Sequence, residues 1–245
     1  MLTLSQKEEF NQNGYYVIEQ MLETDLLAQI CHAFDLLEGY RNLLDHDITF
    51  LSVANHPILV SAIESILESR PQLLQFDGIA RQPNTPDQGW HADFTFYCDR
   101  PLMLNVGVYL DELTADNGPI CVVPGSHKHG TPPPRDPRDA GNLPDELRLT
   151  VPAGTAVIFD CTTWHRGGGN RSDKVRRAIF PTYGHYWMKR FETWMPYASE
   201  ERFPETTSPE LQALLGIALN MPSAYGGYDE KAVVRKGLDG KWESS

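Results

Sequence analysis

Apolar and polar residues alternate at intervals of three and four in the first third of the chain, as in helices that bury one face. The pattern is clearest over residues 24–40 (TDLLAQICHAFDLLEGY) and 56–69 (HPILVSAIESILES). Gly39 predicts the end of the first of these helices, and Pro57 fits the first turn of the second. We therefore expect two helices that each pack one face onto a core.

Capping residues predict a further helix near each end of the chain. The sequence SQKE has the form of a capping box, with Ser5 as the N-cap, Glu8 reaching back to it and Gly14 as the stop. Near the C-terminus, Ser208 and Gly216 enclose the segment SPELQALLG. Both segments are expected to form short helices.

The period changes from helical to strand-like at about residue 72, and glycine and proline become frequent. Several short strands without helices between them predict a β-sandwich or barrel, with the early helices packed outside it. The expected strands cover residues 73–81, 102–110, 120–123, 155–160 and 175–183.

The length of 245 residues suits one large domain or two small ones, and we expect a single domain over residues 1–245. It would have a helical part to about residue 70, a β core over about 71–190 and a helical C-terminal segment over about 191–245. The proline-rich residues 130–146 predict a surface loop that is long enough to form a lid or the rim of an active site.

Composition narrows the class of protein. Hydrophobic residues make up 41% of the chain and charged residues 22%, which favours a packed core over disorder. A formal net charge of −12 argues against nucleic acid as a partner, since phosphate binding needs clustered Lys and Arg. Neither a signal peptide nor an apolar stretch of about 20 residues is visible, so we expect a cytoplasmic protein that does not contact a membrane. The four cysteines form no C-x-x-C pair and are expected to be reduced and mostly buried.

The stretch GWHADFTF contains the first candidate chemistry. His91 and Asp93 are two residues apart, so both side chains point to the same face of an extended backbone and could bind adjacent positions on one metal ion. A third ligand from a neighbouring strand would complete one face of an octahedron. Two imidazoles and one carboxylate in this arrangement are the ligands of non-haem Fe(II) oxygenases. An isolated H-x-D pair is weak evidence by itself.

A second stretch, TTWHRGGGN, strengthens this interpretation. His165 follows an expected strand and precedes a glycine-rich turn into the next strand, which carries Arg176 and Arg177. An arginine in an apolar strand requires an anion, and its planar guanidinium suits a carboxylate held at two points. Alternation along the strand places the two arginines on opposite faces and does not decide which of them faces a ligand.

Other residues near these motifs are open to two interpretations. His127 and His129 form an H-x-H pair such as cupin metal sites use, although a tight turn favours a structural role for them. Some of the aromatic residues that flank the motifs are expected to line a mostly apolar substrate pocket. These are Trp90, Phe94, Phe96, Tyr97, Trp164, Tyr186 and Trp187.

The order of these motifs resembles the phytanoyl-CoA dioxygenase family of Fe(II)- and 2-oxoglutarate-dependent oxygenases. The H-x-D pair is followed by D-x5-NGPICVVPGSHK-x-G over residues 111–130, then by His165 with NRSD, and by Arg176 eleven positions after that histidine. The resemblance covers the chain from about Ser5 to Gly216. It implies a double-stranded β-helix, or jelly-roll, of the cupin-like kind with flanking helices.

The resemblance also implies a cofactor set and an activity. His91, Asp93 and His165 would hold Fe(II), and Arg176 would bind the distal carboxylate of 2-oxoglutarate, which selects between the two arginines. The expected enzyme is a dioxygenase that uses O2 to oxidise a small molecule, most simply by hydroxylation, with release of succinate and CO2. Ascorbate would serve as a reductant in vitro. The substrate could be a natural-product intermediate, and the oligomeric state is left open.

Some positions depart from the family pattern or match it weakly. Members often carry a hydroxyl two residues after the distal histidine, where this chain has Gly167. Arg81 matches a basic position near the site in relatives, and Asn105 could hydrogen-bond the co-substrate or only a strand neighbour. Two alternatives remain: a catalytically silent metal-binding jelly-roll that serves as a ligand-binding module, and a cupin-type isomerase or dioxygenase that uses His127 and His129.

Overall fold

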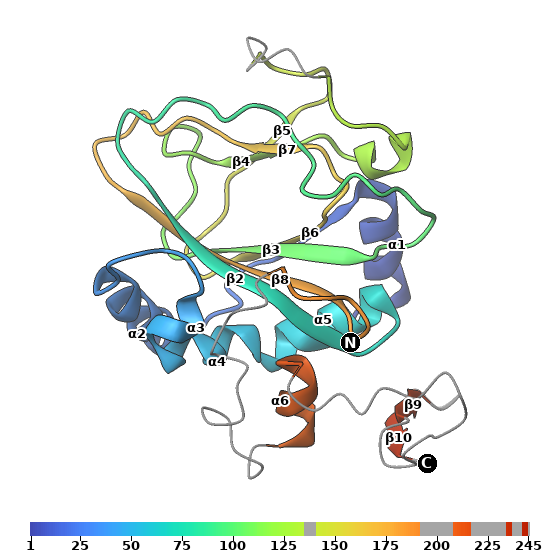
Figure 1. The fold of residues 1–245 in the computed structure, drawn as a ribbon. Helices are drawn as coiled ribbons and strands as arrows, with labels where there is room; N and C mark the ends of the chain where they lie inside the picture. Colours follow the sequence, from blue (N-terminus) through green and yellow to red (C-terminus); the bar gives the residue numbers. More distant parts are fainter. Residues whose placement is uncertain (135–140, 192–207, 217–233, 237–241, 245) are drawn as a thin grey trace.

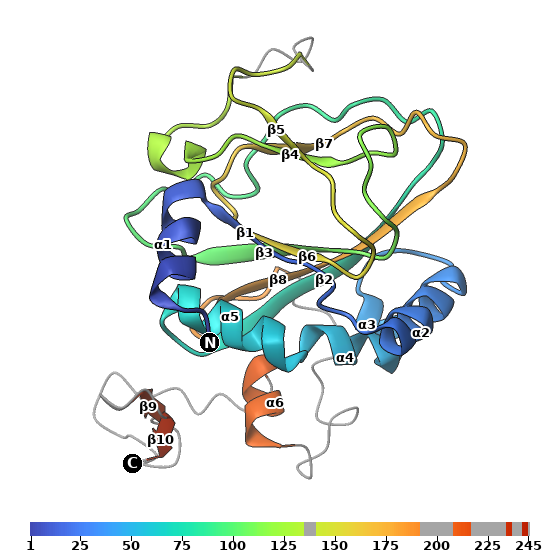
Figure 2. The ribbon, with the colours of Figure 1, turned by 180° about the vertical axis from the view of Figure 1, so that it is seen from behind.

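Two antiparallel sheets face each other in the computed structural model of the chain, and a layer of helices covers the outer face of the larger sheet (Figures 1 and 2). The structure describes residues 1–134, 141–191, 208–216, 234–236 and 242–244. This arrangement is the jelly-roll with flanking helices that the sequence predicts. The C-terminal helical segment expected over 191–245 lies mostly outside the described residues.

The larger sheet contains five strands in the order β1-β6-β3-β8-β2. Neighbouring strands in this sheet are antiparallel, and β2 and β8 pair along most of their length. The strands are β1 (Tyr15–Ile18), β2 (Pro71–Arg81), β3 (Met103–Tyr109), β6 (Ala156–Asp160) and β8 (Arg176–His185). Four of them fall where the alternation of the sequence predicts strands, and β1 was not expected.

The smaller sheet has the order β5-β4-β7 and lies across the inner face of the larger one (Figure 1). Its strands are β4 (Ile120–Val122), β5 (Leu147–Leu149) and β7 (His165–Gly167). An isolated antiparallel bridge joins the backbone of His91 to that of His165, with N–O distances of 3.0 and 2.9 Å. The backbone of the H-x-D motif is thereby fixed against the strand that carries the second histidine.

Helices pack on the outer face of the larger sheet and along its edge (Figure 2). They are α1 (Leu4–Asn13), α2 (Thr24–Asp35), α3 (Leu43–His46), α4 (Leu51–Ala54), α5 (Pro57–Leu67) and α6 (Pro209–Leu214), with short 3-10 helices η1 (Ile48–Phe50) and η2 (Ser126–His129). Two further strands, β9 (Val234–Lys236) and β10 (Trp242–Ser244), form a separate hairpin. No single helix in the described part of the chain is long and apolar enough to cross a bilayer, although the bent pair over 48–54 and 57–67 meets that test by length and composition alone.

Alternation along the central strands separates the core from the cavity between the sheets. On β3, Leu104, Val106 and Val108 are buried in the core cluster that includes the helices. Asn105 and Tyr109 project to the opposite face and line the cavity between the sheets. The apolar outer face of the sheet therefore stabilises the helical layer, while its inner face is free to carry polar groups.

Most of the expected helix limits agree with the structure, and two are wrong. Gly14, with φ of 78°, ends α1, and the Ser208 hydroxyl accepts a hydrogen bond from the Leu211 amide at the start of α6. However, α1 is capped by Thr3 in place of Ser5, because Thr3 and Gln6 form the reciprocal capping box. Helix α2 also ends before Gly39.

The early end of α2 has a packing explanation. Its last residue is Asp35, and the next residue, Leu36, is 69% exposed. The chain then turns so that the ring of Tyr40 stacks on that of Phe34, with 5.1 Å between centroids. The four cysteines are free, as expected, with Cys121 and Cys161 buried, Cys31 half-buried and Cys98 exposed.

Candidate active site

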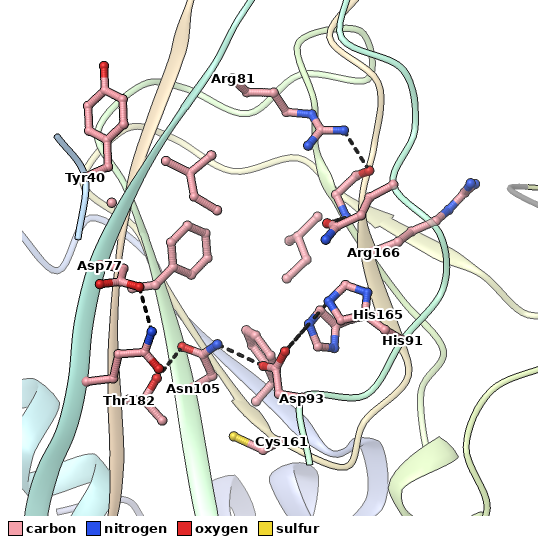
Figure 3. Close-up of a pocket in the computed structure, with 18 of the residues that line it drawn as sticks. Tyr40, Asp77, Arg81, His91, Asp93, Asn105, Cys161, His165, Arg166 and Thr182 are labelled. Atoms are coloured by element: carbon pink, nitrogen blue, oxygen red, sulfur yellow. Dashed lines mark hydrogen bonds and ion pairs between the residues drawn. The ribbon is translucent and has the colours of Figure 1, made fainter. Parts of the chain in front are cut away.

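His91, Asp93 and His165 come together at one side of the cavity between the sheets (Figure 3). One possible ligand atom from each residue lies within 4.8 Å of the other two. The Oδ1 atom of Asp93 is 3.7 Å from Nε2 of His91 and 3.5 Å from Nε2 of His165. Two imidazoles and a carboxylate therefore surround a space of the size that a single metal ion requires.

Backbone carbonyls fix the orientation of both imidazoles. Nδ1 of His91 lies 3.0 Å from the carbonyl oxygen of Gly89, and Nδ1 of His165 lies 2.9 Å from that of Thr163. A carbonyl oxygen only accepts, so each Nδ1 carries a proton and donates it. Each Nε2 is then left with its lone pair directed at the shared space, which is the arrangement that metal-binding histidines use.

The charge balance of the three groups favours a cation. Burial alone would raise the pKa of Asp93, but the adjacent His165 and a hydrogen bond from Asn105 hold that pKa well below its usual range. Burial lowers the pKa of His91, and the neighbouring His165 lowers it further. Burial also works against protonation of His165, yet the Asp93 carboxylate outweighs it and raises that pKa. The carboxylate is thus anionic, and a metal cation bound between the three groups would replace the proton of His165 as its positive partner.

Asn105 holds the second oxygen of this carboxylate. Its Nδ2 donates to Oδ2 of Asp93 at 2.9 Å, while its Oδ1 accepts from the Val106 amide at 2.9 Å and from the Thr182 hydroxyl at 3.3 Å. These contacts leave Oδ1 of Asp93 directed at the two histidines. The amide thus orients the carboxylate, and binding of a co-substrate by Asn105 stays a prediction.

Replacing Asn105 by alanine should weaken metal binding by about 10- to 100-fold, the usual effect of removing a group that orients a ligand. The reason is that Asp93 would be free to rotate away from the histidines. The measurement is the affinity for Fe(II), or for Co(II) as a stable substitute, in competition with a chelator. Asn55→Ala, an exposed position in the helical layer, serves as the control. Unchanged metal affinity in Asn105→Ala would show that the amide only connects neighbouring strands.

The cavity beside these residues has a volume of about 620 Å³. Its walls come from β2, β3, β6 and β8 of the larger sheet and from β4 and β7 of the smaller one. A cavity of this size is typical of sites that enclose a small molecule. The three candidate ligands lie in its wall, so an ion bound by them would face the enclosed space.

The structure distinguishes Arg176 from Arg177. Arg176 is 4% exposed and projects into the cavity, with its guanidinium carbon 5.6 Å from the ring centroid of Tyr109. Arg177 projects to the other face of β8, where it forms ion pairs with Asp111 at 2.7 Å and Asp35 at 2.9 Å. Among the described residues, Arg177 therefore has two carboxylates as ion-pair partners, and Arg176 has none.

Two atoms of Arg176, Nε and Nη1, are buried and have no hydrogen-bond partner among the described residues. Burial lowers the pKa of this guanidinium, and the nearby charge of Arg81 adds to that effect. Arg81 is the direct partner of Arg176 across the β2–β8 ladder. A buried cation without an anion is costly, so this end of the cavity is suited to an anionic ligand.

Arg81 also explains the glycine at position 167. Its Nη2 donates to the carbonyl oxygens of Pro86 and Gly167, at 2.6 and 3.2 Å. A Cβ atom added at Gly167 would lie only 3.0 Å from Nη1 of Arg81 and 3.3 Å from Oε1 of Gln88. The arginine thus occupies the space that a side chain at position 167 would need.

The expected aromatic lining is wrong. None of the seven aromatic residues that flank the motifs lines this cavity. Its aromatic groups come from positions far from the motifs in sequence, Tyr40, Tyr109, Phe159, Phe180 and Phe191. Trp90 instead packs beneath the guanidinium of Arg166, at 4.9 Å, and Trp164 packs against His129. These two flanking aromatic residues therefore pack against other side chains of the protein and do not line the cavity.

The cavity is also more polar than the sequence suggests. Its wall on β2 carries Gln75 and Asp77, and β8 contributes Thr182 (Figure 3). No local motif in the sequence indicates a role for these three residues. The sequence feature that could have identified the β2 residues is the alternation of the strand. Gln75, Asp77 and Arg81 share one face, so if one of them faces the cavity, the others do too.

His127 and His129 lie away from the three candidate ligands, in η2. Nε2 of His127 is 3.2 Å from the carbonyl oxygen of Asn11, and His129 packs edge-on against Trp164. In the described part of the chain they belong to no group of residues that could hold a metal. A cupin-type site at this pair has no structural support. The proline-rich loop over 130–146 lies partly outside the described residues.

The fold and the site together define a jelly-roll protein with two histidines and one carboxylate at the edge of an internal cavity. Residues 38–178, more than half of the chain, match the family model described as phytanoyl-CoA dioxygenase (PhyH). The chain belongs to this family.

Curated relatives include enzymes that act on small molecules. The chain is 29% identical over 171 residues to L-proline trans-4-hydroxylase of Streptomyces griseoviridis, covering 57% of this chain and 64% of that protein. It is 31% identical over 123 residues to ectoine dioxygenase of Stutzerimonas stutzeri, covering 39% and 41%. The chain therefore matches less than two thirds of the length of these relatives.

Solved structures share the fold. HygX from Streptomyces hygroscopicus, solved with nickel and 2-oxoglutarate bound, superposes with a TM-score of 0.68 at 17% identity and covers 78% of this chain and 89% of its own. EctD from S. alaskensis, solved with bound Fe, gives a TM-score of 0.65 at 22% identity and covers 76% and 77%. At this level of identity the likeness defines the architecture.

Proposed function

We propose that the protein is an Fe(II)- and 2-oxoglutarate-dependent dioxygenase that hydroxylates a small molecule. The observation that carries this proposal is the pairing of two features in one cavity. His91, Asp93 and His165 offer the ligand set of a non-haem iron, and Arg176 offers a buried guanidinium without an anion. Family membership and the named activities of the relatives support the same chemistry.

The residues present fit both groups. Nε2 of His91, Nε2 of His165 and Oδ1 of Asp93 would hold the iron, since their other polar atoms already have partners in the protein. Fe(II) with 2-oxoglutarate supplies an oxidation in which O2 converts the co-substrate into succinate and CO2 and one oxygen atom enters the substrate. These three residues would hold the iron from one side of the cavity, and the rest of the cavity would be available to the co-substrate.

The chain's own residues would bind, orient and shield these groups. Arg176 would bind the distal carboxylate of 2-oxoglutarate through its two unpartnered nitrogens, with the charge of Arg81 beside it. Asn105 would hold Asp93 in its binding orientation. The walls of the cavity would exclude bulk water, which strengthens each of these charge interactions.

Succinate release tests the proposal and separates it from a catalytically silent binding module. Purified protein with Fe(II), ascorbate, O2 and 2-oxoglutarate should form succinate slowly even without a substrate, and removal of the metal by a chelator should stop it. A silent jelly-roll would bind iron and form none. Iron-loaded protein that forms no succinate would contradict the proposed function.

The substrate is proposed to be a small molecule, as it is for the named relatives. The enclosed volume of about 620 Å³ must also hold the co-substrate, so it limits the size of the group that reacts. A natural-product intermediate is compatible with that volume. The cytoplasmic location and the single-domain organisation stay predictions.

A further inference from the structure

The charged side chains that β2 and β8 direct into the cavity lie toward its two ends. At one end, Arg81 and Arg176 face each other across the ladder; toward the other, Gln75 is the partner of Thr182, and Asp77 lies on the same inward face. Apart from Asp93, Asp77 is the only carboxylate that lines the cavity among the described residues. The inward-facing cations of these two strands therefore lie at one end of the cavity, and their inward-facing carboxylate lies toward the other.

Asp77 is nearly buried, at 9% exposure, and lies across the cavity from the two histidines (Figure 3). Its Oδ1 accepts from the Asn42 amide at 2.9 Å, and its Oδ2 accepts from Nε2 of Gln75 at 2.6 Å. In the described part of the chain its one charged partner is Arg41, which also pairs with Oδ2. A carboxylate in this setting depends on that partner to offset its desolvation.

The ion pair between Arg41 and Asp77 is weak. The side chain of Arg41 is 78% exposed, and ion pairs with an exposed member contribute little to stability because water and salt screen them. A ligand that fills the cavity would cover Asp77 further and remove its remaining water. An apolar ligand would leave the carboxylate more poorly compensated than before, whereas a cationic group would compensate it inside the cavity.

We propose that Asp77 is the anchor for a protonated amine of the substrate, with Gln75 and Thr182 beside it as further hydrogen-bonding groups. This inference rests on the proposed function and specifies its substrate class: small amines, amino acids among them. The bound ammonium displaces Arg41 from Oδ2 of Asp77. The substrate then lies between Asp77 and the histidines, opposite in charge to the 2-oxoglutarate held at the arginine end.

The experiment compares matched compounds in the succinate assay. The proteinogenic amino acids and a set of primary amines are tested against the N-acetyl derivative of each, which removes the positive charge and keeps the carbon skeleton. Some of the amines should raise succinate release several-fold above the substrate-free rate, and their N-acetyl derivatives should not. Stimulation by the N-acetyl compounds, or by none of the amines, would overturn the inference.

Two variants show whether Asp77 binds the substrate amine or only makes a structural contact with Arg41. Asp77→Asn keeps the shape of the side chain and the acceptor for the Asn42 amide, yet it should raise the amine concentration for half-maximal stimulation about thirtyfold or more, the usual result of removing one charge of a desolvated pair. Arg41→Gln removes the competing cation and should lower that concentration. If Asp77 only fastened the segment around Arg41, both variants would shift the concentration in the same direction.

The controls keep this inference distinct from the proposed function. Asp173→Asn makes the same charge change at an exposed site and should leave stimulation unchanged. The substrate-free succinate rate of each variant is measured in the same assay, so that a loss of turnover is told apart from a loss of amine binding. If wild-type protein formed no succinate without a substrate, the proposed oxygenase activity itself would be rejected. A normal substrate-free rate with full amine stimulation in Asp77→Asn would reject the anchor alone.

Discussion

Replacing His165 by alanine should reduce bound iron to less than about a tenth of the wild-type content and abolish succinate formation. The loss of a direct ligand costs at least as much affinity as the loss of a group that orients one. The fold should survive, because the bridge between His91 and His165 uses backbone atoms alone. Iron content per chain and the melting temperature are the two measurements.

The control for this variant is His129→Ala. His129 packs on Trp164 and lies outside the proposed ligand set, so its removal should leave the iron content unchanged. Full iron occupancy in His165→Ala would reject the ligand assignment. Loss of iron in the His129 variant, with retention in the His165 variant, would favour a cupin-type site at η2 instead.

Replacing Arg176 by alanine should raise the 2-oxoglutarate concentration for half-maximal activity about a hundredfold. The co-substrate would lose its charged partner inside a buried cavity, and removing one side of such a pair costs about 2–5 kcal/mol. The matched control is Arg177→Ala. That change breaks the ion pairs with Asp35 and Asp111, so it should lower the melting temperature and leave the requirement for 2-oxoglutarate unchanged.

The two arginine variants distinguish the faces of β8. If Arg177→Ala raised the requirement for 2-oxoglutarate and Arg176→Ala did not, the inward face of the strand would be the opposite one. Equal and small effects would mean that the anionic end of the co-substrate binds elsewhere in the cavity. Arg81, beside Arg176 in the ladder, would then be the next candidate.

Local sequence pattern was sufficient for most of the fold. The helical period and Pro57 placed α5, and period-two alternation placed β2, β3, β6 and β8 to within about two residues. Strand β1 (YYVI) does not show the polar and apolar alternation of a half-exposed strand in its sequence. In the structure, accordingly, its four residues are all half-buried. The choice between Ser5 and Thr3 as the N-cap depended on which residue the Gln6 side chain could reach, and a sequence does not show this.

The candidate ligands could be proposed from the sequence because two of them are close neighbours along it. His91 and Asp93 share a strand face, and His165 is marked by the turn that follows it. Arg176 and Arg177 were different, since alternation alone puts one on each face and only family spacing favoured Arg176. The structure supplies the physical reason for the difference between them: Asp35 and Asp111 meet Arg177 on the outer face.

The substrate side of the cavity could not be predicted from local pattern. Tyr40 and Arg41 reach the cavity from the segment after α2, and Asp77 belongs to a strand whose inward face is defined only by its pairing with β8. Three segments distant in sequence meet there. Trp90, next to the first motif, instead packs against the guanidinium of Arg166.

The most direct test of the central claim is an anaerobic titration of 2-oxoglutarate into wild-type protein, with and without Fe(II). If the histidines, Asp93 and Arg176 act together, one 2-oxoglutarate should bind per iron, with a visible charge-transfer band that develops in step with binding, and affinity without the metal should be far weaker. Equal binding in the presence and absence of Fe(II), or binding of iron with no effect of 2-oxoglutarate on its spectrum, would contradict the claim that one cavity holds both.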